Sequence, residues 1–278
     1  MPVRLVQTNS GNFYLGDLDE IRYFNRALDL SQDTHLIDDE RWETAKRCLK
    51  REFGHAQSWE ICRNIILNFE QVYSRKYHSD WTNYLFESKL EDFYPVQGEA
   101  IVVSTIHKAK GKEFDNVFLL LTNIESLSDE KKREVYVAIT RAKQNLSIHT
   151  NGHYLSNIAN GLAEYRINSN TYPAPQSLCY TLTHRDLWLD FFIDSHCQAA
   201  INTLKSGMSL RLTEKGCTDF SNNEILRFSK KFKDILNELI QKDYKLEKAS
   251  VNFVVYWEKQ EDKKEAKIVL PKVVFKKV

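Results

Sequence analysis

Two short stretches of the sequence decide the fold: Ser104-Thr-Ile-His-Lys-Ala-Lys-Gly-Lys-Glu-Phe-Asp115 and Glu134-Val-Tyr-Val-Ala-Ile-Thr-Arg-Ala-Lys143. We call them the first and the second motif. Apolar, β-branched runs lie on both sides of the first motif, and a helical pattern leads through the second motif into another strand. The expected elements are strands at Ala100–Ser104, Asn116–Leu121 and Asn145–His149 and a helix at Ser128–Lys143. This strand–turn–strand–helix–strand order predicts the edge of a parallel α/β sheet.

The first motif is rich in groups that suit a nucleic-acid backbone. Gly111 allows the chain to turn sharply or to approach a phosphate closely. Three lysines create a local positive field, and a threonine and a histidine can donate hydrogen bonds to phosphate oxygens. These residues are Lys108, Lys110, Lys112, Thr105 and His107. Without the second motif, a solvated basic turn between two strands would be the commoner explanation.

Arg141 in the second motif is the strongest candidate for a catalytic group. Phosphoryl transfer develops negative charge on the γ-phosphate oxygens, and a planar guanidinium offers them paired donors. An arginine of this kind can supply a large factor in rate. The alternative is a cation at the C-terminal end of a helix, where it is stabilised by the helix dipole.

Together the two motifs resemble motifs V and VI of UvrD/Rep-type superfamily-1 DNA helicases. The first motif is similar to the family pattern T-[IV]-H-x-x-KG-x-E-[FW] and the second to YVA-[IL]-TRA, and they follow in the family's order. The resemblance is close over about Gly98–Gly152 and weaker over Val3–Leu28. It implies a second RecA-like helicase domain, built on a parallel sheet, in a motor that moves 3′ to 5′ along single-stranded DNA.

The resemblance also implies roles for individual residues. Thr105, His107 and Lys110 would line the single-strand groove. Glu113 would hydrogen-bond the nucleotide ribose, with Gly111 on the nucleotide side. Arg141 would be the arginine finger that reaches ATP and Mg²⁺ held by a first RecA-like domain. RNA as the track is a weaker alternative, because the RNA-directed branch usually has Asp and Gln in place of His107 and Lys110.

The sequence also departs from the complete helicase pattern. No GxxxxGK[ST] phosphate loop occurs in it, so we expect the chain alone to be inactive as an ATPase and to need an upstream first RecA-like domain. Lys112 stands where Leu is more usual, and the helical stretch Asp38–Leu90 is smaller than the family's usual insertion, which puts the usual duplex contacts in doubt. The chain also opens directly on the β-like run Val3–Gln7, which suggests a fragment. A non-catalytic nucleic-acid-binding or partner-docking module on a helicase-derived fold is the alternative function.

Composition sets broad limits on the other functions. The 278 residues carry a net charge of +1, so no global basic field attracts nucleic acid. No apolar run approaches the roughly 18 residues of a membrane span, and the first residues lack a signal-peptide core. The five cysteines are far apart without a CxxC pair, which argues against a metal site and favours reduced thiols in the cytoplasm.

Three domains are predicted along the chain. Residues 1–165 would be the second RecA-like domain with a helical insertion at about 30–95, residues 166–205 a linker with connecting helices, and residues 206–278 a small β-rich, barrel-like domain. The stretch Lys205–Val278 has 17 Lys and Arg against 11 Asp and Glu, a net charge of +6. A basic barrel with aromatic side chains could stack single-stranded bases, although aromatics that fill a small core are the simpler explanation.

Two local predictions bear on later sections. Asp17 is expected to cap a helix, with Glu20 at the capping-box position. The apolar and aromatic segment His184–Phe192 is predicted to be a helix that packs between domains rather than a ligand site.

Overall fold

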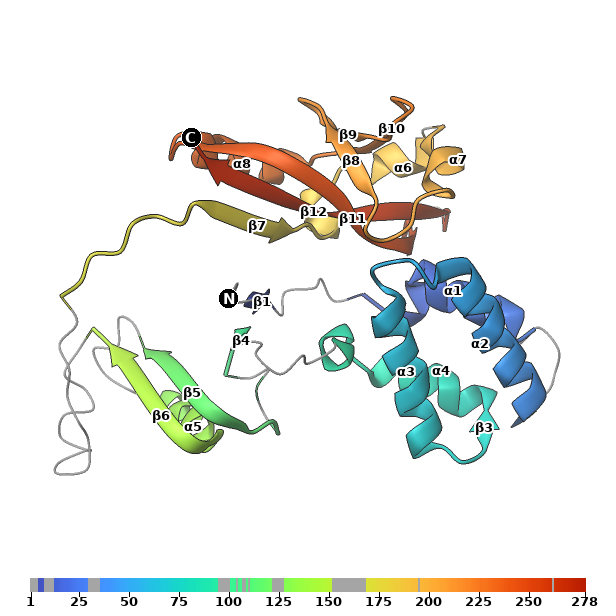
Figure 1. The fold of residues 1–278 in the computed structure, drawn as a ribbon, viewed down its shortest axis with the longest axis horizontal. Helices are drawn as coiled ribbons and strands as arrows, with labels where there is room; N and C mark the ends of the chain where they lie inside the picture. Colours follow the sequence, from blue (N-terminus) through green and yellow to red (C-terminus); the bar gives the residue numbers. More distant parts are fainter. Residues whose placement is uncertain are drawn as a thin grey trace. The chain divides into compact units, whose positions relative to one another are not determined.

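The chain folds into two compact units in the computed structural model. The structure describes residues 5–7, 13–29, 36–94, 101–103, 105–106, 109, 111–121, 128–151, 169–194, 196–261 and 263–278. Unit 1 comprises Met1–Thr8 and Glu99–Pro173, and unit 2 comprises Asn9–Gly98 and Ala174–Val278. The chain therefore crosses between the units more than once, and each unit is made of segments far apart in the sequence (Figure 1).

Unit 1 is built from parallel strand pairs. Strand β1 (Leu5–Gln7) pairs in parallel with β4 (Ile101–Val103). Strand β5 (Phe114–Leu121) pairs in parallel with β6 (Ala142–Thr150), and α5 (Asp129–Ile139) connects them. The predicted strands around the two motifs are thus confirmed, but the helix predicted at Ser128–Lys143 ends earlier, at Ile139, because its last predicted residues already belong to β6. Within the described residues the two pairs form separate two-stranded sheets.

Helix α5 covers one face of the β5–β6 pair. It begins after Ser128, whose side chain accepts a hydrogen bond from the backbone N–H of Lys131, as expected for a serine N-cap. A small core lies between helix and strands and consists of Leu119, Leu121, Val135 and Ala138. This packing fixes where α5 ends and β6 begins, and so positions the second motif.

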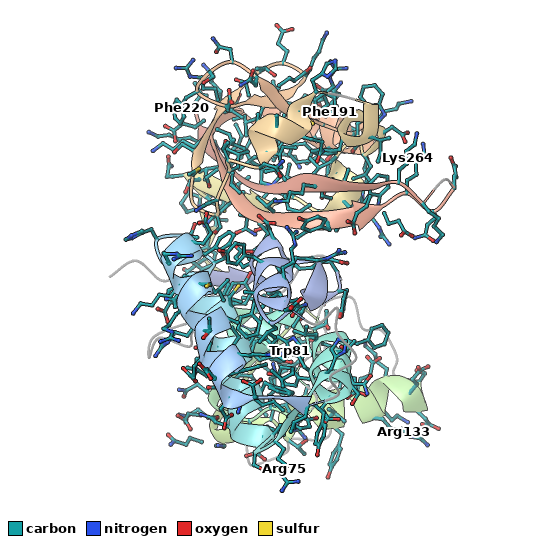
Figure 2. All side chains as sticks on the ribbon, turned by 90° about the vertical axis from the view of Figure 1, so that its right-hand side faces the viewer. Arg75, Trp81, Arg133, Phe191, Phe220 and Lys264 are labelled. Carbon is teal, nitrogen blue, oxygen red and sulfur yellow. The ribbon has the colours of Figure 1, made fainter. Side chains whose placement is uncertain are left out.

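The helical part of unit 2 surrounds an aromatic core. Its elements are η1 (Leu15–Asp17), α1 (Asp19–Ala27), β2 (Leu36–Ile37), α2 (Asp39–Phe53), α3 (Trp59–Val72), β3 (Lys76–Tyr77), α4 (His78–Glu87) and η2 (Leu90–Phe93). The rings of Phe24 and Trp42 meet edge to face with centroids 5.0 Å apart, and those of Trp42 and Trp81 do so at 5.3 Å. Trp81 lies inside this part of the molecule (Figure 2). The helical stretch predicted at Asp38–Leu90 is confirmed as α2, α3 and α4, apart from the two-residue strand β3.

The predicted start of the first helix is wrong. Helix α1 begins at Asp19 with Leu18 at the N-cap and no side-chain cap, while Asp17 belongs to η1 and forms an ion pair with Arg22 at 3.1 Å. Glu20 is buried, and its Oε1 accepts a hydrogen bond from the hydroxyl of Ser58. Arg22, five residues along the same segment, and Ser58, at the start of α3, bind these two carboxylates in place of the expected capping hydrogen bonds.

The C-terminal part of unit 2 is a six-stranded antiparallel sheet. Its strands are ordered β10-β9-β8-β11-β12-β7, with bounds β7 Ser177–Thr181, β8 Ser209–Leu212, β9 Gly216–Thr218, β10 Glu224–Arg227, β11 Tyr244–Glu258 and β12 Glu265–Lys277. The described helices are η3 (His184–Asp186), α6 (Asp190–Asp194), α7 (Cys197–Ile201) and α8 (Lys230–Ile240). The two edge strands, β10 and β7, do not pair within the described residues, so the predicted barrel-like closure is not seen.

The continuous helix predicted at His184–Phe192 is wrong. This segment contains the short η3 and the start of α6, and between them Leu187 forms an antiparallel bridge with Phe228. The backbone N–H of Trp188 donates to the carbonyl of Arg227 at 2.9 Å. Pairing with a distant segment therefore replaces the helical hydrogen bonds that the local sequence favours.

One hydrophobic core joins the helices of unit 2 to its sheet. Buried side chains from α1, α2 and α3 belong to the same cluster as those of β10, β11 and β12, and Leu18 forms a bridge with Val255. The helical segment thus folds together with the C-terminal sheet. The chain as a whole is a mixed α/β protein with parallel strand pairs and an antiparallel sheet.

Candidate functional site

The second motif spans the end of α5 and the start of β6, where Arg141 follows the C-cap residue Thr140. The Arg141 Nε donates to the carbonyl oxygen of Val137 at 3.0 Å, and Nη2 donates to the Thr140 hydroxyl oxygen at 3.2 Å. Nη1 donates to the carbonyl oxygen of Lys112 at 3.2 Å. The guanidinium group therefore connects the end of helix α5 to the turn of the first motif.

The first motif forms a turn that leads into β5. Gly111 has φ +83°, a left-handed conformation that favours glycine. A Cβ added there would meet no atom within 4 Å. The space next to this backbone is therefore open in the described part of the structure.

The parallel strand pair holds the two motifs next to one another. The backbone N–H of Phe114 donates to the carbonyl of Arg141 at 2.9 Å, and Phe114 lies opposite Ala142 in the ladder. This register places the turn that contains Gly111 beside the end of helix α5. The contact lies at the N-terminal ends of β5 and β6, where the connection from α5 enters the strand pair.

Glu113 and Lys143 complete the described part of this region. The Lys143 Nζ lies 3.7 Å from the Glu113 Oε2, and their side chains are 54% and 57% exposed. An ion pair this exposed contributes little to stability. Both groups are therefore accessible to a ligand at small cost in lost interactions.

The structure places some of the predicted site residues and not others. It brings Gly111, Glu113 and Arg141 together at the contact between the motifs, and Thr105 is exposed. The predicted DNA-contacting residues His107 and Lys110 lie outside the described residues. Their roles remain predictions.

The described part of the chain offers neither a candidate metal site nor a candidate membrane span. Among the residues that the structure describes, no three His, Cys, Asp or Glu side chains cluster in a way that could hold a metal ion, and the five cysteines are thiols rather than halves of disulfides. No described helix is long and apolar enough to span a membrane.

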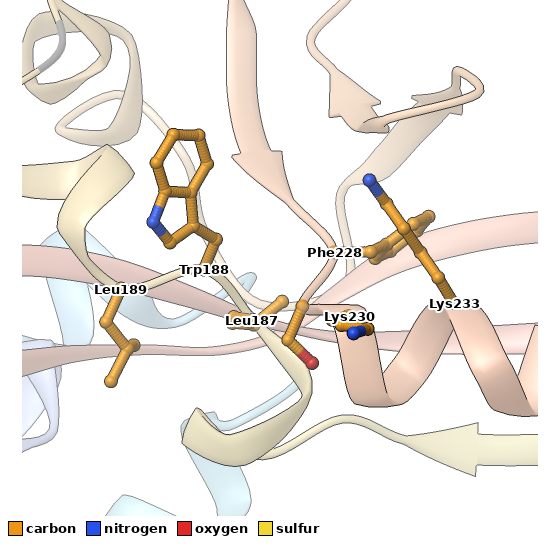
Figure 3. A pocket seen from close by; sticks show the side chains of 7 residues that line it. Leu187, Trp188, Leu189, Phe228, Lys230 and Lys233 are labelled. Atoms are coloured by element: carbon orange, nitrogen blue, oxygen red, sulfur yellow. The ribbon is translucent and has the colours of Figure 1, made fainter.

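Sequence analysis missed a second candidate site, a groove in unit 2 (Figure 3). It lies where Leu187–Leu189 runs beside the connection from β10 to α8. The sequence contains the elements of this site, Trp188 and the lysines of α8. It does not show that they lie together, because about 40 residues separate the two segments, nor that Trp188 is exposed.

Comparison with known proteins identifies the region that holds both motifs. The family model described as the UvrD-like helicase C-terminal domain matches residues 61–153, about a third of the chain. No curated protein and no solved structure matches the chain. The matched span starts in α3 and includes the turn with Gly111 and the helix end with Arg141. The chain therefore carries a UvrD-like helicase C-terminal region, as the two motifs predicted.

Proposed function

We propose that this chain supplies the second motor domain of an ATP-dependent helicase that translocates 3′ to 5′ on single-stranded DNA. One observation carries the proposal: Arg141 of the second motif donates to the Lys112 carbonyl of the first motif at 3.2 Å. A motor needs its nucleotide-sensing group and its DNA-binding turn to move together. This hydrogen bond and the adjacent strand ladder make that connection.

The hydrogen-bond partners of Arg141 support its proposed role as an arginine finger. Its three described acceptors are two backbone carbonyls and one hydroxyl, all neutral. No carboxylate in the described part of the chain pairs with it. A guanidinium has five N–H donors, so donors remain for a phosphate oxygen. Its positive charge can thus act on the γ-phosphate, where charge develops during transfer.

The remaining nucleotide contacts fit the same end of unit 1. Glu113 is exposed and could accept hydrogen bonds from a ribose, and the open space beside Gly111 would allow a phosphate to approach the backbone. The phosphate loop and the Mg²⁺ ligands would come from a first RecA-like domain, which we expect upstream in the same protein. That domain would bind ATP, and Arg141 would complete the site.

On the DNA side, the expected contacts Thr105, His107 and Lys110 precede Lys112, which Arg141 contacts, in the sequence of the first motif. Hydrogen bonds from Ala109 N–H to the Thr105 and Ile106 carbonyls, both at 3.2 Å, shape this turn. A change in Arg141 on ATP hydrolysis would therefore reach the phosphate contacts through one short segment. This is our proposal for how hydrolysis is coupled to movement.

The test is the Arg141→Ala variant of the protein that contains both motor domains. We expect kcat for DNA-stimulated ATP hydrolysis to fall by roughly 10³-fold or more, while ATP binding measured with a non-hydrolysable analogue changes little. Arg133→Ala is the matched control, because Arg133 is an exposed arginine on α5, the helix that ends just before Arg141 (Figure 2). Equal turnover in the two variants would refute the proposal.

One observation favours a second candidate, a non-catalytic nucleic-acid-binding module. The bond from Arg141 to the Val137 carbonyl is the one expected of a cation that only caps a helix end. In that case Arg141→Ala would lower the melting temperature of the isolated chain without any effect on turnover in the intact protein.

A further inference from the structure

The groove of unit 2 combines an exposed aromatic ring with two lysines. Its volume is about 480 Å³ and it is open to solvent. The residues that line it are Leu187, Trp188, Leu189, Phe228, Ser229, Lys230 and Lys233. Figure 3 shows the indole of Trp188 on one side and the two lysine side chains on the other.

The indole of Trp188 is exposed and held in position. Its neighbour Leu187 is buried through the bridge to Phe228, and this turns Trp188 outward, where the residue is 47% exposed. The Cζ of Arg227 lies 5.4 Å from the indole ring centroid. Arg227 is itself held by two hydrogen bonds to the carboxylate of Glu224, at 2.7 and 2.6 Å. The ring is therefore in place before any ligand arrives.

The lysines give the groove a positive potential. Lys230 and Lys233 lie three residues apart in the first turn of α8 and are exposed, so they project from one side of the helix. No carboxylate among the described residues pairs with either lysine, and the first turn of α8 contains no acidic residue. The helix dipole adds further positive potential at this end.

We infer that this groove binds one nucleotide of single-stranded nucleic acid. The base would stack on the exposed part of the Trp188 ring, and the adjoining phosphate would lie against Lys230 and Lys233. Aromatic stacking next to lysines is how proteins hold single strands without sequence preference. The choice of nucleic acid over other anions rests on the proposed function, whereas the groove itself does not use the two motifs of unit 1.

Fluorescence anisotropy of labelled (dT)12 titrated with the 278-residue chain across a salt series tests this inference. Trp188→Ala should weaken binding roughly 5- to 150-fold, the range for loss of one stacked base, and Trp188→Phe should restore most of the affinity. Replacing both Lys230 and Lys233 with alanine should reduce the salt slope by about 0.7, the value for one neutralised phosphate on a single strand. An abasic oligomer of the same length should bind wild type and Trp188→Ala equally.

Two matched controls separate the groove from general surface effects. Phe220 is an exposed aromatic residue in the same unit with an arginine, Arg211, 5.3 Å above its ring. Lys231 lies in the same helical turn as the groove lysines but does not line the groove. Phe220→Ala should bind as wild type does, and Lys231→Ala should weaken binding less than either groove lysine.

Several results would overturn the inference: no (dT)12 binding by the wild-type chain, unchanged binding by Trp188→Ala, or an equal loss with Phe220→Ala. If Trp188→Ala bound (dT)12 as wild type does but no longer bound a phosphopeptide, the groove would be assigned to a peptide instead. The helicase proposal has a separate test. If Arg141→Ala kept normal ATP turnover while (dT)12 binding still depended on Trp188, the helicase proposal would fail and the groove inference would stand.

Discussion

The free energy of unfolding of Glu20→Gln should rise relative to that of wild type as the pH increases from 4.5 to 7. The Glu20 side chain is buried between α1 and α3 and is only 2% exposed. Its Oε1 accepts a hydrogen bond from Ser58, but Oε2 has no hydrogen-bond partner in the described structure. Burial, chiefly, raises the pKa of this carboxyl from 4.5 to about 7, and nearby Asp19 raises it further while Lys267 lowers it.

The direction of the effect follows from proton binding. Between pH 4.5 and 7 the folded protein keeps the Glu20 proton that the unfolded chain has already released. The free energy of unfolding therefore falls as the pH rises through this window. Because one pKa unit corresponds to about 1.4 kcal/mol, the loss amounts to about 3 kcal/mol once the pH exceeds 7. Glutamine resembles the protonated acid and has no such loss.

Urea unfolding of wild type and Glu20→Gln at a series of pH values from 4.5 to 8.5 measures this difference directly. All other titrating groups are the same in the two proteins, so the difference in their free energies of unfolding reports the ionisation of Glu20 alone. It should grow by about 3 kcal/mol across the series. Glu60→Gln, at an exposed glutamate on α3, is the control and should show no such growth. Parallel pH profiles for wild type and Glu20→Gln would refute the assignment of a buried, protonated carboxyl.

Two further predictions concern the motor. The isolated chain should show no ATPase activity with or without DNA, because its sequence lacks a phosphate loop; turnover by a purified sample that Arg141→Ala abolishes would contradict the shared-site model. In the protein with both motor domains, Lys110→Ala should weaken single-strand binding about equally for all sequences and reduce the salt slope by about 0.7. Anisotropy across a salt series measures both quantities, and unchanged values would remove the first motif from the DNA groove.

The elements around the two motifs could be predicted because their signals are local. The strand β5 follows from an apolar, β-branched run, and α5 from a serine cap followed by a periodic apolar face. The positive φ at Gly111 was likewise foreseeable from the residue type and its place in a turn. The contact between Arg141 and the Lys112 carbonyl was not, because it depends on the parallel register that sets Phe114 opposite Ala142.

The incorrect predictions share a physical cause. Asp17 looked like a helix cap, yet Arg22 pairs with it and α1 starts two residues later. The segment around Trp188 looked helical, yet Leu187 and Trp188 pair with Phe228 and Arg227 from a distant part of the chain. The first partner belongs to the same segment and the second to a distant one, but in both places a side-chain or backbone partner offered an interaction that helix propensity does not take into account.

The sequence by itself determined the two motifs, their order, the strands and helix that hold them, and hence the helicase C-terminal region that the family comparison matches. Only the tertiary structure decided that the helical segment shares a core with the C-terminal sheet, that Glu20 is buried, and that Trp188 is exposed beside Lys230 and Lys233. Periodicity along a chain reports which residues share a face of one element. Which faces then meet depends on contacts between residues far apart in the sequence. Those contacts also decide which charged groups are buried and which aromatic rings stay exposed to solvent.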